Sequence, residues 1–191
     1  NPLLWFLQHY MWNSPYNPSI DAKVHDAWAD GYVTVNKAFA QAIIEEAGKM
    51  ATNPIVMTHD YHLYLAPGYI RQGLPNAIIQ HFIHIPWPSP RYWKLLPAHM
   101  RISICKGLLG ADVVGFQSMT DVRNFLDSCE QFMTNYEIDH NKQLISHEGR
   151  TVKVRAYPIS VNVDEIIRIA NSPRAQEHER RLRSEIQGST I

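Results

Sequence analysis

Two short polar blocks decide the fold of this chain: Thr58-His59-Asp60-Tyr61-His62-Leu63 and Gln80-His81-Phe82-Ile83-His84-Ile85-Pro86. Each block follows a short apolar run, Pro54 to Met57 before the first and Ala77 to Ile79 before the second. Apolar runs rich in β-branched residues are typical of central strands in a sheet that is covered on both faces. The interval between the blocks holds one helical segment, Leu65 to Arg71. The pattern therefore predicts a βαβ unit with parallel strands and a right-handed crossover.

Both polar blocks lie where ligands bind in an open α/β sheet, at the carboxyl ends of the strands. A sugar or phosphosugar needs fixed hydrogen-bonding groups and flat rings. The chain offers Asp60, His59, His62 and His84 as hydrogen-bonding groups, and Trp5, Tyr61 and Trp87 as rings. The alternative is that His59 and His81 are satisfied core histidines and that the tryptophans simply pack. That alternative is weaker for Asp60 and His84, because they close two adjacent strands at the ligand edge.

Other kinds of site have less support in the sequence. The histidines offer metal ligands, but residues 81 and 84 of a single strand would point to opposite faces, so we assign no metal. A Gly-x-Ser-x-Gly nucleophile elbow does not occur, and Ser118 is interpreted as a helix cap. Neither a Walker motif nor a Rossmann glycine fingerprint occurs, so we expect no cofactor and no nucleotide site built by this chain alone.

The composition describes an ordinary globular protein. The 191 residues are 45% hydrophobic and 19% charged, which predicts one domain with a sizeable core. The 18 basic and 18 acidic residues cancel, so neither nucleic acid nor an anionic membrane is an expected partner. The apolar opening, Asn1 to Trp12, is too short to span a bilayer. Cys105 and Cys129 stand in no motif, and we expect them to be reduced in a cytoplasmic protein.

The remaining sequence predicts strands that alternate with helices. Asn1 to Tyr10 is interpreted as a strand or an apolar turn, and Ser19 to Ile44 as a long amphipathic helix capped by Ser19 or Asp21. The other expected elements are a rigid proline-rich loop at 85–90, a helix from Pro97 to Leu109, a strand at 112–116, a helix from Thr120 to Phe132 capped by Thr120, a hairpin of 143–146 with 151–157, and helices at 163–170 and 173–187. This order predicts an α/β fold, a mainly parallel sheet with helices on both faces.

Composite motifs stand along nearly the whole chain. They are Leu4-Trp5 with His9-Tyr10, Trp28-x-x-Gly31-Tyr32-x-x-Val35-Asn36-x-x-Phe39-Ala40, His59-Asp60-Tyr61-His62-Leu63, His84-Ile85-Pro86-Trp87-Pro88-Ser89, Leu96-Pro97, Gly115-Phe116-Gln117 and Tyr157-Pro158-Ile159. This series resembles the trehalose-6-phosphate synthases, glycosyltransferase family 20. The resemblance implies the Rossmann-like N-terminal half of a GT-B enzyme. Such an enzyme transfers glucose from a nucleotide-glucose, UDP-glucose, to glucose 6-phosphate with retention and without a required metal.

The same resemblance implies a role for four residues. Trp5, Asp60 and Tyr61 would line the acceptor-sugar pocket, and His84 would contact the donor glucose near the reacting centre. Asp60 and His84 are therefore the expected catalytic positions. Transfer of this type is described as front-face, with the leaving phosphate taking the acceptor proton, so the protein contributes mainly positioning and electrostatics. We expect the proline-rich loop to fix the approach of the His84 imidazole.

The chain also departs from the whole family pattern. An N-terminal strand with a glycine-rich loop should precede Asn1, and a C-terminal nucleotide-sugar domain should follow Ile191. We therefore expect residues 1–191 to be a single acceptor-side domain, incomplete at its N-terminus and inactive by itself. Its expected partners are that C-terminal domain, the nucleotide-sugar donor and the sugar-phosphate acceptor, and a homo-oligomer stays open. Alternatives are a glucosylglycerol-phosphate synthase, a pseudo-glycosyltransferase of the family, a non-catalytic regulatory domain and a metal-dependent hydrolase.

Overall fold

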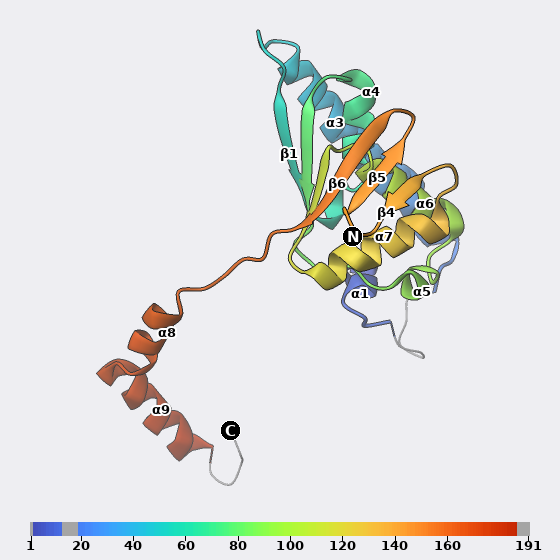
Figure 1. Ribbon diagram of the computed structural model, residues 1–191. Coiled ribbons are helices and arrows are strands. Elements are labelled where there is room, and N and C mark those ends of the chain that lie inside the picture. Colours follow the sequence, from blue (N-terminus) through green and yellow to red (C-terminus); the bar gives the residue numbers. More distant parts are fainter. Residues whose placement is uncertain (1, 13–18, 187–191) are drawn as a thin grey trace. The chain divides into compact units, whose positions relative to one another are not determined.

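The computed structural model describes residues 2–12 and 19–186, which form two units (Figure 1). The first unit runs from Asn1 to Pro158 and the second from Ile159 to Ile191. Within the described residues, no helix is both long enough and apolar enough to cross a membrane.

The chain begins with helices. Helix α1 (Pro2–Gln8) replaces the strand or turn expected there, so that prediction is wrong. Leu4 and Leu7 are three residues apart and both are buried, which suits a helix, but so short an apolar run does not distinguish a helix from a strand. The long helix that follows is confirmed as α2 (Ala22–Asp26), the π-helical segment η1 (Ala27–Val33) and α3 (Thr34–Ala47). Asp21 caps it by accepting a hydrogen bond from the backbone N–H of Val24.

One six-stranded sheet organises the first unit. Its order is β1-β2-β3-β6-β5-β4. The strands are β1 (Ile55–His59), β2 (Ile78–Phe82), β3 (Val113–Phe116), β4 (Glu137–Asp139), β5 (Leu144–His147) and β6 (Arg150–Ala156). The pairs β1/β2, β2/β3 and β3/β6 are parallel, and β6/β5/β4 are antiparallel. The predicted mainly parallel sheet and the hairpin are confirmed, and β4 is a strand that the sequence did not predict.

Helices cover the face of the sheet that holds the core. After β1 come a single 3₁₀ turn, η2 (Tyr61–Leu63), and α4 (Ala66–Gly73), which packs against β2. The others are α5 (Pro90–Trp93), α6 (Ala98–Leu108) and α7 (Met119–Phe132), and α7 packs against β3 and β6. Ser118 caps α7, as its interpretation as a cap predicted, whereas the choice of Thr120 as the cap is wrong.

The first two strands are less covered than their apolar sequence predicts. β1 stands at the edge of the sheet, and Ile55, Met57 and Ile78 are more than half exposed. Val56 and Ile79, which the register places side by side, are buried under the helices instead. Alternate residues of a strand face opposite sides, so in the described residues only one side of this βαβ unit is packed.

The second unit contains α8 (Val163–Ala170) and α9 (Pro173–Glu185), as the sequence predicted. Ser172 caps α9 through its hydroxyl, and Pro173 occupies the first helical position. Glu179 and Arg183, four residues apart on α9, form an ion pair at 2.9 Å.

Candidate functional site

The two polar blocks leave the sheet at the same edge. His59, the last residue of β1, is paired in register with Phe82, the last residue of β2. Asp60 then donates its backbone N–H to the carbonyl of Phe82 at 2.8 Å. The backbone N–H of His84 in turn donates to Oδ1 of Asp60 at 3.3 Å. The structure therefore brings Asp60 and the His84 backbone together at the ends of two neighbouring strands, with Asp60 half-buried and His84 exposed.

Asp60 has an unusual backbone conformation, φ 64° and ψ 175°. Only glycine adopts this region readily, and a residue with a side chain is strained there by about 1–3 kcal/mol. The conformation turns the chain sharply out of β1 and lets the Asp60 carbonyl accept the backbone N–H of Leu63 at 3.2 Å. Strain of this kind persists where the surrounding structure holds it, and here it coincides with the candidate site.

Tyr32 holds the turn that follows Asp60. Its hydroxyl donates to the carbonyl of Tyr61 at 2.6 Å and accepts the backbone N–H of Tyr64 at 3.3 Å. Burial raises the pKa of Tyr32 far above its ordinary value, and the nearby Asp60 raises it further. The phenol therefore stays neutral and keeps its donor hydrogen. In the sequence, Tyr32 stood in a composite motif within the expected long helix, without an assigned role.

Asn36 on α3 completes the support of this turn and is itself fully buried. Its amide nitrogen donates to the carbonyls of Tyr32 and His62, at 2.9 and 3.0 Å. Its amide oxygen accepts the backbone N–H groups of Leu65 and Ala66, both at 3.0 Å. Those N–H groups begin α4 and would otherwise lack partners. The sequence contained this residue as part of a motif, but assigned it no role.

The histidines of the two blocks separate into two environments. His84 and His59 lie outside, with Nε2 of His84 3.1 Å from Nδ1 of His59. His81 is fully buried, and its Nδ1 lies 2.8 Å from the hydroxyl of Thr58. Burial, and after it the proximity of His59, lowers the pKa of His81 to about 3. His81 is thus a neutral core histidine, whereas His59 is not in the core.

The separation of these histidines also bears on the metal alternative. Strand β2 ends at Phe82, so the odd-spacing argument does not apply to His84; the structure shows His81 buried and His84 exposed. Among the described residues, the group whose geometry could hold a metal is Asp127, Glu130 and His140. Its residues belong to α7 and to the segment after β4.

Trp87 belongs to the core. It is 1% exposed, and its indole N–H donates to the hydroxyl of Ser128 at 3.1 Å. Its backbone N–H donates to Oδ1 of Asp121, and its carbonyl accepts the side-chain amide of Asn124. The idea that Trp87 offers a ring to a sugar is therefore wrong. These bonds instead anchor the proline-rich loop to α7, directly after His84.

Trp5 stands on α1 and is 38% exposed, with its ring centroid 4.2 Å from that of His9 and the two rings tilted by 32°. Helix α1 is tied to the site by Gln8, whose side-chain amide donates to the hydroxyl of Tyr64 at 2.7 Å and to the carbonyl of Pro86 at 3.3 Å. Trp5 thus stays available for stacking, on a helix that contacts the loop after His84.

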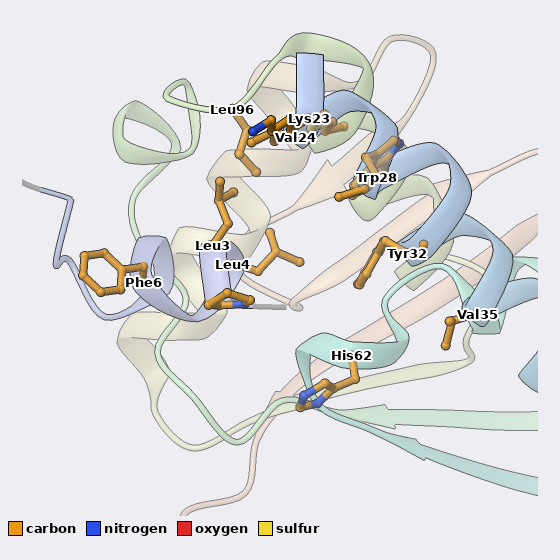
Figure 2. A pocket seen from close by; sticks show the side chains of 14 residues that line it. Leu3, Leu4, Phe6, Lys23, Val24, Trp28, Tyr32, Val35, His62 and Leu96 are labelled. Carbon is orange, nitrogen blue, oxygen red and sulfur yellow. The ribbon is translucent and has the colours of Figure 1, made fainter. Parts of the chain in front are cut away.

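A cavity of about 890 Å³ lies on another side of α1 (Figure 2). Leu3 and Leu4 of α1, Trp28 and Tyr32 of the long helix and His62 of η2 line it. Trp5, Asp60 and His84 do not line it. Because a sugar needs many hydrogen-bonding groups and this lining is almost wholly apolar, the cavity does not suit the predicted sugar site.

The whole chain, residues 1–191, matches the sequence model of glycosyltransferase family 20. The chain belongs to this family. An α,α-trehalose-phosphate synthase (UDP-forming) of Pichia angusta is 36% identical over 172 residues, which is 87% of this chain and 33% of that protein. A validamine 7-phosphate valienyltransferase of Streptomyces hygroscopicus is 33% identical over 157 residues, 82% of this chain and 31% of that protein.

Two solved structures share the fold. The N-terminal domain of a Candida albicans trehalose-6-phosphate phosphatase is 30% identical with a TM-score of 0.73, over 98% of this chain and 38% of that one. An Escherichia coli trehalose-6-phosphate protein bound to UDP-2-fluoro glucose is 26% identical with a TM-score of 0.72, over 94% of this chain and 37% of that one. The chain therefore spans about a third of the length of these relatives. The GT-B likeness expected from the motifs is confirmed for the fold.

Proposed function

We propose that the full-length protein containing this chain transfers glucose from UDP-glucose to glucose 6-phosphate with retention, giving trehalose 6-phosphate. The observation that carries the proposal is the hydrogen bond between the His84 backbone and the Asp60 carboxylate at the carboxyl edge of a family 20 sheet. One carboxylate and one imidazole, from neighbouring strands, then face a single ligand-binding edge.

Each proposed residue has a chemical role that its surroundings permit. Asp60 orients the acceptor, because one of its oxygens is held by His84 and the other can accept a sugar hydroxyl. Trp5 and Tyr61 supply rings for the acceptor, and the exposed His84 contacts the donor glucose. Asp60 is not an attacking base in this scheme. The leaving phosphate takes the acceptor proton, and the protein lowers the barrier by holding the two sugars in place.

The donor nucleotide needs a partner domain. The proposed partner is the C-terminal half of the same enzyme, whose basic and acidic residues would hold the phosphates and the ribose. The chain alone supplies one side of the cleft, so we expect residues 1–191 to show no turnover with UDP-glucose and glucose 6-phosphate.

Two of the alternatives are favoured by particular relatives. The valienyltransferase of Streptomyces, at 33% identity, favours a pseudo-glycosyltransferase that joins cyclitols. The Candida structure, at 30% identity, is the N-terminal domain of a protein named as a phosphatase, so a domain without transferase activity stays an alternative.

A product assay on the full-length protein tests the proposal. UDP-glucose is offered with glucose 6-phosphate and with glycerol 3-phosphate, validamine 7-phosphate is offered separately with a nucleotide-activated valienyl donor, and the anomeric configuration of any glucosyl product is determined by NMR. We expect trehalose 6-phosphate with both anomeric centres α. If product forms only with glycerol 3-phosphate, the protein is a glucosylglycerol-phosphate synthase and the proposed acceptor, glucose 6-phosphate, is wrong. Absence of product from every acceptor, in a folded protein that still binds UDP-glucose, would favour the non-catalytic domain.

A further inference from the structure

His59 makes a contact that none of the assigned roles uses. Its Nδ1 lies 3.1 Å from Nε2 of His84, and the two rings are stacked with centroids 5.3 Å apart. Both side chains are exposed, so the contact is not imposed by core packing. His59 ends β1, and His84 follows β2 in the neighbouring strand.

A hydrogen bond between two imidazoles restricts the protons of both rings. One nitrogen must carry the hydrogen and the other must offer a lone pair. If His59 donates from Nδ1, the neutral His84 carries its proton on Nδ1. If His84 donates from Nε2, its Nδ1 is the acceptor. In either case Nε2 of His84 is committed to His59, and Nδ1 is the nitrogen that can meet a ligand.

The backbone of His84 is held as well as its ring. Its N–H donates to Oδ1 of Asp60, the residue that directly follows His59. His59 and Asp60 are consecutive residues at the end of β1. His59 contacts the ring of His84, and Asp60 accepts the backbone N–H of His84. A bond between two ring nitrogens couples the tautomers of both rings, because one nitrogen donates only when the other accepts, and it restricts the orientation of His84.

We propose that His59 is a positioning residue for His84, fixing the tautomer and direction of the imidazole that meets the donor glucose. The importance of His59 for turnover rests on the proposed function, whereas its control of the tautomer of His84 does not. The inference therefore has one test on this chain and one on the complete enzyme.

The first test is the tautomer of His84 in the chain of 191 residues, read from the ¹⁵N shifts of its ring at neutral pH. We expect a single dominant tautomer in the native sequence and a mixture in His59→Phe, which keeps a flat ring but has no nitrogen. His25 and His99 form a matched pair, with rings stacked at 5.4 Å, so His25→Phe is the control and should leave His84 unchanged. An unchanged tautomer in His59→Phe would overturn the inference.

The second test is kinetic and uses the full-length protein. We expect His59→Phe to lower kcat about tenfold with little change in KM, which corresponds to the loss of one hydrogen bond of about 1.4 kcal/mol. His59→Asn keeps a polar atom near the place of Nδ1 and should recover most of the rate. In a His84→Ala background the His59→Phe change should cost nothing further, because the residue it positions is gone.

The outcomes separate this inference from the proposed function. If His59→Phe lowers kcat about tenfold even in the His84→Ala background, the inference is overturned, because His59 would then act by another route. If His59→Phe changes the tautomer of His84 but leaves turnover unchanged, the proposed role of His59 in the reaction is overturned. If His84→Ala itself has no effect on turnover while the tautomer still depends on His59, the assignment of His84 to the reaction fails, and the control of its tautomer by His59 stands.

Discussion

The backbone N–H of His84 donates to the carboxylate of Asp60 across 24 residues of sequence, at 3.3 Å. This bond joins the residue proposed to hold the acceptor to the residue proposed to meet the donor. It exists because β1 and β2 are parallel neighbours with His59 in register with Phe82. Loss of the Asp60 carboxylate should therefore disturb the placement of both sugars, whereas a change of the His84 side chain keeps this backbone bond.

The first prediction concerns turnover of the full-length protein. Asp60→Asn and His84→Ala should each lower kcat/KM at least about tenfold, equivalent to about 1.4 kcal/mol of transition-state stabilisation. Asp60→Asn keeps an oxygen for the His84 N–H but loses the negative charge, so its loss should be mainly in acceptor KM. Steady-state kinetics with each substrate varied in turn measures both effects. Unchanged kinetics in both variants would remove these residues from the site.

The second prediction concerns the strained backbone of Asp60. Glycine relieves a conformation at φ 64° and ψ 175°, whereas alanine keeps the strain and also loses the carboxylate. Asp60→Gly should therefore be more stable than Asp60→Ala by about 1 kcal/mol, the reverse of the usual order. Urea unfolding of the 191-residue chain measures the difference.

The control for this pair is Asp30, which lies in a helical segment and is exposed. At position 30 the alanine variant should have a free energy of unfolding about 0.5–1 kcal/mol higher than the glycine variant. If alanine is also the more stable choice at position 60, the conformation of Asp60 is not strained.

The third prediction concerns stability in acid. The pKa of His81 is about 3 in the folded chain, below its unfolded value of about 6.5. Below pH 6.5 the unfolded chain takes up a proton that the folded chain refuses, so the free energy of unfolding falls by about 1.4 kcal/mol per pH unit until pH 3. Above pH 6.5 this contribution vanishes. His81→Phe removes it, so the loss of stability between pH 7 and pH 5 should shrink by about 2 kcal/mol.

Chemical unfolding at both pH values tests this prediction, with His178→Phe as the exposed control. The free energy of unfolding of the control variant should fall between pH 7 and pH 5 by as much as that of the native chain. An equal loss in His81→Phe and in the native chain would show that His81 takes up its proton in the folded state.

The sequence predicted the parallel βαβ unit and the meeting of Asp60 with His84, because strand ends and their order are local properties that topology converts into proximity. It did not predict the support of that site by Tyr32 and Asn36, because those hydrogen bonds depend on where a distant helix packs. The role expected for Trp87 was wrong for the same reason, because the sequence alone does not show whether a tryptophan is exposed or buried. The apolar stretch around Ile55 predicted burial on both faces, which the described residues do not show at β1.

The fourth prediction concerns the contact of α6 with the turn before α4. A Cβ on Gly107 would stand 2.3 Å from the carbonyl oxygen of Tyr64 and 2.6 Å from Cα of Leu65. Both are backbone atoms that cannot rotate away, so Gly107→Ala should lower the free energy of unfolding by about 2 kcal/mol or more. The matched change is Gly31→Ala, where a Cβ meets no atom within 4 Å and the helix gains up to about 1 kcal/mol. Opposite signs in urea unfolding are expected, and equal effects would contradict the close contact.

The last prediction tests whether one amide holds the turn behind Asp60. Asn36→Leu has a similar volume, but leaves the N–H groups of Leu65 and Ala66 and the carbonyl of His62 without their partner in a buried place. Each unpaired buried group costs about 1–3 kcal/mol, so the variant should lose about 3 kcal/mol or more of stability. Gln41→Leu on the exposed side of the same helix should change stability by less than about 0.5 kcal/mol. Hydrogen exchange at the Leu65 and Ala66 amides should accelerate in Asn36→Leu before global unfolding does, because α4 then begins without its cap. Native protection of those amides in a folded Asn36→Leu chain would mean that the turn is held by Tyr32 alone.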